Sequence, residues 1–169
     1  ASAVLGALYA LMENDLKRLL AFSTIENIGI VVIGLAVAVL AQGRGIALLA
    51  TVALTAALVH TVNHGLFKAA LFLAAGSVQA ASGTRDLNRL GGLARVMPVT
   101  TAVFVLGAAA ISGLPPLNGF TGEWLTFGAL LAGASDLAFS PLVRSAILVA
   151  VGALALTAAL AVATFVKAS

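Results

Sequence analysis

The sequence predicts an all-α protein, a polytopic bundle of transmembrane helices, from three observations. Of its 169 residues, 62% are hydrophobic and only 9% are charged, whereas a soluble domain has about 25% charged residues. The mean hydropathy is +1.14. Several apolar runs reach the roughly 20 residues that a helix needs to cross a bilayer. A soluble domain of this length cannot bury so much apolar surface, so we expect an integral membrane protein.

Five apolar blocks follow one another along the chain. They are residues 1–12, 22–41, 46–80, 97–132 and 143–166. Twelve helical residues extend only about 18 Å, which is too short to cross a membrane. We therefore expect the first block to be the end of a helix that starts earlier. Residues 1–169 are then a fragment that forms a single transmembrane domain.

Polar connectors separate these blocks. They are residues 12–20, 42–45, 82–98 and 133–141. In the first connector, Asn14 or Asp15 can cap a new helix, because their side chains accept hydrogen bonds from the first free backbone N–H groups. The second connector is a tight break that contains Gly43 and Gly45. We expect each connector to be a loop at a membrane surface.

Charge placement predicts the topology. If every complete block crosses once, loops 13–21, 81–96 and 167–169 lie on one side. That side carries Lys17, Arg18, Arg85, Arg89, Arg95 and Lys167, and the other side carries Arg44 and Arg144. The excess of positive charge predicts that loops 13–21 and 81–96 are cytoplasmic. A hairpin within block 46–80 would weaken the bias, so we expect one crossing there. For block 97–132 the tally is the same with one crossing or two, and both remain open.

The composition also excludes several chemistries. The chain has no cysteine, which excludes disulfides, thiol catalysis and iron–sulfur ligation by thiolates. The net charge of +3 is small, and no basic patch indicates nucleic-acid binding. We expect the chain to lie in a lipid bilayer and to bind no nucleic acid.

Block 46–80 carries a stripe of polar side chains in its middle. His60, His64 and Lys68 follow at spacings of four residues, so they lie along one face of a helix. A lysine at the centre of a membrane helix costs roughly 2.5–3.5 kcal/mol on the insertion scale, and such residues face the bundle interior or water. Histidine and a desolvated lysine can both exchange protons at physiological pH. The stripe therefore predicts stepwise proton transfer.

Two other interpretations of this stripe remain open. The histidines, together with Asn63, can bridge neighbouring helices by hydrogen bonds alone. His60 and His64 also match half of a zinc site, although no carboxylate lies near them in the sequence. We expect no metal here.

Block 97–132 is interrupted by the segment SGLPPLNGFTGEW, residues 112–124. The residues that predict a broken helix are Gly113, Pro115, Pro116, Asn118 and Gly119. Prolines remove backbone donors, and a membrane helix broken near 113–119 is tolerated only inside protein or beside a wet cavity. Broken helices mark ion sites in transporters, so Glu123 is a candidate proton carrier. Alternatively, the break is a plain loop and Glu123 lies in water at an interface.

A second carboxylate, Glu26, lies in the segment STIENIG, about one turn inside block 22–41. It can bind a proton or a cation, or it can pair with a basic group. A carboxylate this close to a helix end can also reach water, so Glu26 alone does not indicate a proton or cation site.

Four motifs in order resemble one family over residues 10–130. NDLKRLLAFSTIENIGI, VNHGLFKAALFLAAGSV, TRDLNRLGGLARVMP and AISGLPPLNGFTGEW resemble the antiporter-like, proton-translocating membrane subunits of respiratory complex I (NADH:quinone oxidoreductase). Hydrogenase-4, formate hydrogenlyase and Mrp-type antiporters share the fold. The sequence of the segment STIENIG resembles the component B type of hydrogenase-4 more than it resembles complex I.

The resemblance implies a fourteen-helix subunit with two inverted five-helix repeats, of which this chain would be about half, the second repeat. It implies that His64 and Lys68 lie on a central polar axis and that Glu123 is the ionisable group of the discontinuous helix. The first repeat, with another glutamate and lysine, would be needed for a complete proton path. It also implies a bacterial inner membrane.

The expected function is a non-redox pumping subunit of an energy-converting oxidoreductase complex. The relay would consist of His60, His64, Lys68, Glu123 and Glu26, with no cofactor in this chain. Other membrane subunits and a peripheral redox arm would be its partners, and a quinone or a hydrogenase only an indirect one. A Na⁺/H⁺ antiporter subunit, with oxygen ligands from Ser112, Asn118, Thr121 and Glu123, and a structural membrane anchor are the alternatives.

Overall fold

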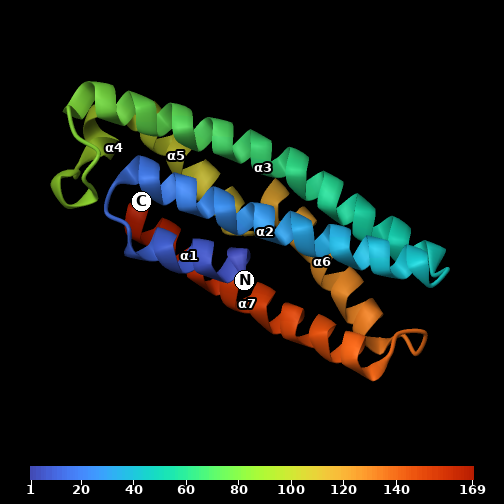
Figure 1. The fold of residues 1–169 in the computed structure, drawn as a ribbon. Coiled ribbons are helices and arrows are strands. Elements are labelled where there is room, and N and C mark those ends of the chain that lie inside the picture. Colours follow the sequence, from blue (N-terminus) through green and yellow to red (C-terminus); the bar gives the residue numbers. More distant parts are fainter.

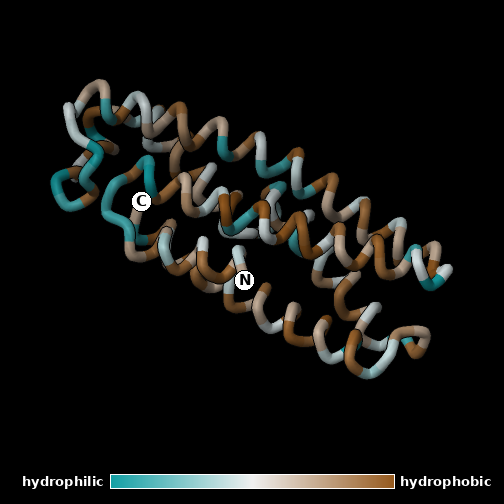
Figure 2. Tube along the Cα trace, in the orientation of Figure 1, coloured by the Kyte–Doolittle hydropathy of each residue, from teal (hydrophilic) through white to brown (hydrophobic).

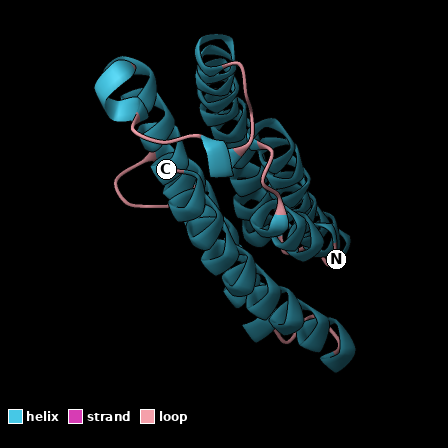
Figure 3. Ribbon diagram, turned by 90° about the vertical axis from the view of Figure 1, so that its left-hand side faces the viewer, coloured by secondary structure: helices cyan, strands magenta, loops and turns pink.

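The computed structural model describes all residues, 1–169, and every regular element in it is a helix (Figures 1 and 3). The elements are α1 (Ser2–Met12), α2 (Leu16–Gly43), α3 (Ala47–Ser82), the 3₁₀ turn η1 (Leu87–Arg89), α4 (Leu93–Val96), α5 (Pro98–Ile111), α6 (Asn118–Ser135) and α7 (Pro141–Ala168). α2, α3 and α7 are long and apolar enough to cross a membrane. The predicted transmembrane helix bundle is confirmed.

The helix α2 begins earlier than the apolar block that predicts it. It starts at Leu16, where the carboxylate of Asp15 accepts hydrogen bonds from the backbone N–H groups of Lys17 and Arg18, each at 3.0 Å. The predicted cap by Asp15 is therefore confirmed. The first turn of α2 thus lies within the charged connector 12–20, because a capped first turn can be charged and still helical.

The break in block 97–132 lies between α5 and α6. Figure 1 shows α6 continuing in the direction of α5 along α3, and the two helices together cross the bundle once. Between them lie residues 112–117, which include Gly113 with a φ of 64° and a cis Pro115–Pro116 bond. In the structure α5 and α6 thus form one discontinuous helix, which favours a single crossing of block 97–132.

The loops sort to two ends of the bundle as the charge pattern predicts. One end of the bundle is formed by residues 13–15 and 83–97 and by the end of α7, and we call it the loop end. There the backbone N–H of Leu16 donates to the carbonyl of Arg85, and Lys167 donates to the carbonyls of Leu11 and Glu13. At the opposite end, Arg44 and Arg144 donate to the carbonyls of Ala138 and Ala134. Figure 2 shows the most hydrophilic colour in the loops beside α4 and the start of α2.

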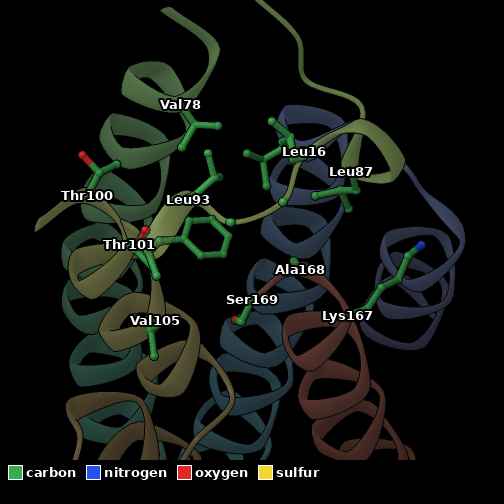
Figure 4. A pocket seen from close by; sticks show the side chains of 15 residues that line it. Leu16, Val78, Leu87, Leu93, Thr100, Thr101, Val105, Lys167, Ala168 and Ser169 are labelled. Carbon is green, nitrogen blue, oxygen red and sulfur yellow. The ribbon is translucent and has the colours of Figure 1, made fainter. Parts of the chain in front are cut away.

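A cavity of about 240 Å³ opens at the loop end, where α4 and α5 meet the end of α7 (Figure 4). Leu93, Val78 and Leu16 line it together with Thr101, and Lys167 stands at its edge. None of the five predicted relay residues lines this cavity. It is therefore separate from the polar groups inside the bundle.

Two apolar clusters fill the bundle. The cluster near the loop end includes Leu19, Leu20, Phe67, Leu71, Ile111 and Phe165. The cluster near the opposite end includes Ile30, Val37, Ala53, Leu130, Ile147 and Leu154. Between the two clusters lie residues 23–27 of α2 and 60–64 of α3. Lys68 starts beside Phe67, at the edge of the first cluster, and its side chain reaches Ser23 in this region. The fold therefore places a polar layer at mid-depth.

Candidate functional site

The polar layer contains all five predicted relay residues, and all five are buried. Lys68 is 6% exposed, His60 is fully buried, and Glu123 is 9% exposed. They come from three helices: Glu26 from α2, the stripe from α3, and Glu123 from α6. Lys68 bonds to Ser23, one turn before Glu26 on α2, and His60 lies against Gly122, the residue before Glu123. The structure thus brings together groups separated by 97 residues, from Glu26 to Glu123.

The stripe on α3 faces inward because the rest of the helix is apolar. Its opposite face carries large exposed hydrophobic residues, which are Leu54, Leu58, Val62, Leu66 and Leu73. That face suits lipid or a neighbouring membrane protein. In contrast, His60, His64 and Lys68 are buried against the other helices, as the four-residue spacing predicts.

The ammonium group of Lys68 is held by neutral oxygens. Its Nζ atom donates a hydrogen bond to the carbonyl of Leu20 at 2.8 Å and another to Oγ of Ser23. The Ser23 hydroxyl itself donates to the same Leu20 carbonyl at 3.1 Å. The structure has only two ion pairs, Arg18–Glu13 and Arg85–Asp15 at the loop end, so Lys68 forms no direct ion pair with a carboxylate. A buried lysine without a contacting counter-charge is expensive for stability alone.

His60 connects α3 to α2. Its Nε2 atom lies 3.1 Å from Oδ1 of Asn27, and Nδ2 of Asn27 donates to the carbonyl of Ser23 at 2.9 Å. His60 therefore bridges α3 and α2 through its Nε2 atom, as one of the two alternative interpretations of the stripe expects. Ser23 and Asn27 are not among the site residues predicted from the sequence. Their spacing of four residues places them on one face of α2, and this polar face beside Glu26 is the signal that could have identified them.

Glu123 lies against the helix break. A Cβ atom added to Gly113 would meet Oε2 of Glu123 at 2.5 Å, so the carboxyl group packs on the backbone that ends α5. The end of an α-helix presents free carbonyl oxygens with partial negative charge. A carboxyl group facing that end is suited to hold a proton or a small cation. The alternative that Glu123 is merely solvated at an interface does not fit its burial.

The other predicted oxygen ligands divide at the break. Ser112 is buried, whereas Thr121 is exposed and faces away from the bundle. Asn118 joins Asn63 instead: Nδ2 of Asn63 donates to the Asn118 carbonyl at 2.8 Å, and Nδ2 of Asn118 donates to Oδ1 of Asn63 at 3.3 Å. This amide pair ties the first turn of α6 to α3, one residue from His64.

The amide pair allows a prediction on stability. Replacing Asn63 with alanine removes two interhelical hydrogen bonds, and we expect a loss of about 1 kcal/mol, since such bonds contribute about 0.6 kcal/mol each in membranes. The matched control is Thr61→Ala on the exposed side of the same helix, because the Thr61 hydroxyl bonds only within α3. Thermal unfolding of the full-length protein in detergent measures both. Equal stability of the two variants would contradict the assigned role of the amide pair.

Three buried polar atoms in the bundle have no hydrogen-bond partner. They are Oε2 of Glu26, Nδ1 of His60 and Nε2 of His64. Buried polar atoms are nearly always satisfied, and exceptions call for a functional explanation or an unseen water. All three belong to titratable side chains of the same layer. The residues present form no group of three or more His, Asp or Glu side chains that can hold a metal ion.

The fold and this layer define a class: antiporter-like membrane subunits with a discontinuous helix and buried ionisable groups. Residues 1–149 match the family described as "NADH:quinone oxidoreductase/Mrp antiporter, TM", and the chain belongs to that family. The resemblance identified from the four sequence motifs is thereby confirmed.

Curated relatives agree with this assignment. The chain is 45% identical over 166 residues to hydrogenase-4 component B and 44% identical over 170 residues to formate hydrogenlyase subunit 3, both of Escherichia coli. These alignments cover 98% of the chain but only 24% and 27% of the relatives. The chain therefore spans about a quarter of their length, and its place as the second repeat of a fourteen-helix subunit stays a prediction.

Antiporter relatives match as well. The chain is 40% identical over 128 residues to one of the Na⁺/H⁺ antiporter subunits of Bacillus subtilis, in an alignment that covers 76% of the chain and 16% of that protein. The structure of the Mrp complex from Dietzia sp. DQ12-45-1b superposes with a TM-score of 0.76 at 35% identity, over 99% of this chain and 16% of that one. The antiporter-like fold is shown.

Proposed function

We propose that the chain belongs to a proton-translocating membrane subunit of an energy-converting oxidoreductase complex, of the hydrogenase-4 or formate hydrogenlyase type or the NADH:quinone oxidoreductase type. The observation that supports it most is the polar layer, in which five titratable side chains from three helices lie buried where two apolar clusters meet. Residues 1–169 would form one transmembrane domain of that protein. A hydrogen-bonded bridge that only holds two helices together would not require five buried titratable side chains.

The relay would use Lys68 as its central group. Ser23 and the Leu20 carbonyl hold the ammonium, Glu26 lies one turn after Ser23 on the same helix, and Glu123 would exchange the proton at the helix break. The unpartnered atoms of Glu26, His60 and His64 offer binding positions for water molecules that would link these side chains. We place loops 13–21 and 81–96 on the cytoplasmic side of a bacterial inner membrane, because these loops and residues 167–169 carry six of the eight positive charges that flank the apolar blocks.

The redox reaction would take place in partner subunits, since this chain has no cysteine and is proposed to carry no cofactor. The relatives named as parts of hydrogenase, formate hydrogenlyase and Mrp assemblies support neighbouring membrane subunits as partners. A peripheral redox arm would change the charge of the polar layer from outside the chain, with a quinone or a hydrogenase acting only indirectly.

A second candidate is a member of a multi-subunit Na⁺/H⁺ antiporter, which the antiporter relatives favour. Sodium binding needs several oxygen ligands. Ser112 and Glu123 are buried near the break, but Thr121 is exposed and the backbone carbonyl of Asn118 already accepts a hydrogen bond from Asn63. The local oxygen set is therefore poor for sodium, and we favour the proton.

The ion can be identified in inverted vesicles that contain the full-length protein in its complex. We expect proton uptake driven by electron transfer to be independent of sodium, and no ²²Na⁺ movement when the proton gradient is collapsed. Proton movement that requires sodium and continues without any electron donor would instead establish the antiporter.

A further inference from the structure

The hydrogen bonds of Asn27 fix where His60 carries its proton. Nδ2 of Asn27 lies 2.9 Å from the Ser23 carbonyl. A carbonyl oxygen only accepts hydrogen bonds, so the amide nitrogen must face Ser23 and the amide oxygen must face His60. That oxygen also only accepts, which means that the bond of 3.1 Å to His60 requires a proton on Nε2.

The other ring nitrogen of His60 faces α6. In neutral imidazole, a proton on Nε2 leaves Nδ1 as an acceptor. A Cβ atom added to Gly122 would meet Nδ1 of His60 at 2.6 Å, so the backbone of α6 passes this atom one residue before Glu123. Nδ1 is fully buried and has no hydrogen-bond partner. The glycine thus allows α6 to approach an unpartnered acceptor.

We propose that Asn27 is a positioning residue that keeps the Nε2 proton of His60 in place, so that a transferred proton binds and leaves through Nδ1 on the α6 side. This inference rests on the proposed proton relay. The incoming proton adds to the Nδ1 lone pair and gives an imidazolium, and the same bond breaks when the proton leaves. An amide oxygen does not pass a proton on, so no proton continues from Nε2 into α2.

The consequence is a different role for His60 than for its neighbours on the stripe. A histidine that conducts protons along a chain binds on one nitrogen and releases from the other. His60 instead stores a proton beside α6 and returns it to the same side. Lys68, held by Ser23 and Leu20 two turns away, remains the group that faces α2.

The tautomer can be observed directly by ¹⁵N solid-state NMR of the full-length protein in its native complex. The resonances that disappear in His60→Gln identify the ring. We expect a neutral ring with the proton on Nε2 in the wild type and in Asn27→Asp, where a carboxylate oxygen still accepts. One hydrogen bond favours the Nε2-protonated ring over the Nδ1-protonated ring by about tenfold. Asn27→Leu removes this bond, so we expect both tautomers to be populated in that variant.

Proton uptake supplies the second readout. We expect uptake to fall about twofold in Asn27→Leu, in proportion to the lost tautomer, and to recover in Asn27→Asp. The matched control is Asn88→Leu in the exposed loop, which should change neither quantity. A proton on Nδ1 in the wild type, or an unchanged tautomer in Asn27→Leu, would overturn the inference.

The two proposals fail in different ways. If uptake depends on Lys68 and Glu123 but the His60 tautomer does not follow Asn27, the inference is wrong and the relay stands. If the tautomer follows Asn27 but His60→Gln and Lys68→Met keep full uptake, the acceptor role of Nδ1 and the proposed relay are both wrong.

Discussion

Replacing Lys68 with methionine is expected to lower proton uptake by about 100-fold, the lower end of what one positioned acid or base contributes. Methionine has nearly the length of lysine and packs in apolar surroundings, so the volume near Phe67 and Leu71 is retained. What it lacks is the ammonium that donates to Ser23 and to the Leu20 carbonyl. Uptake in inverted vesicles, normalised to assembled complex, measures the effect.

Lys17→Met is the matched control for this substitution. Lys17 is partly exposed in the first turn of α2 at the loop end and forms no side-chain hydrogen bond in the structure. We expect it to keep at least half of the wild-type uptake. If the Lys68 variant assembles and takes up protons as fast as the Lys17 variant, Lys68 is a structural residue and the stripe bridges helices.

The largest effect on assembly is expected from Gly119→Val. A Cβ atom at Gly119 would collide with the backbone carbonyl of Ala110, and backbone cannot yield as a flexible side chain can. Overpacking typically costs 1–3 kcal/mol and occasionally more, and we expect about 3 kcal/mol here because α5 and α6 must separate. The yield of full-length protein in the assembled complex and its thermal unfolding temperature measure the loss.

Gly128→Val provides the control on the same helix. Nothing lies within 4 Å of a Cβ atom at Gly128, and valine has a higher helix propensity than glycine. This variant should therefore assemble like the wild type. Equal assembly of the Gly119 and Gly128 variants would show that the close approach at the helix break does not hold the discontinuous helix together.

The sequence predicted the stripe on α3 well because one helix determines it. Residues at spacings of four share a face whatever surrounds them, and an apolar remainder forces that face inward. The discontinuous helix followed in the same way from Pro115 and Pro116. Asp15 as a cap was likewise a local property, and the structure confirms it.

Partners across helices could not be predicted in this way. The hydrogen bonds that His60 donates to Asn27 and Lys68 donates to Ser23 join positions 33 and 45 residues apart. They depend on the rotation of α2 against α3. The apolar block 22–41 begins six residues after α2 does, because hydropathy marks where a helix enters lipid and does not mark where it begins. The position of Glu123 against Gly113 required the path of the break itself.

The measurement that tests the central claim most directly is the number of protons taken up per electron transferred in Glu123→Gln. Glutamine keeps the size and the polar character of Glu123 but cannot carry a proton, and Glu13→Gln at the loop end is its matched control. With both complexes assembled in inverted vesicles, we expect the ratio to fall towards zero for Glu123→Gln and to stay at the wild-type value for Glu13→Gln. An unchanged ratio in Glu123→Gln would contradict the account, because protons would then cross the bundle without the buried carboxyl group at the helix break.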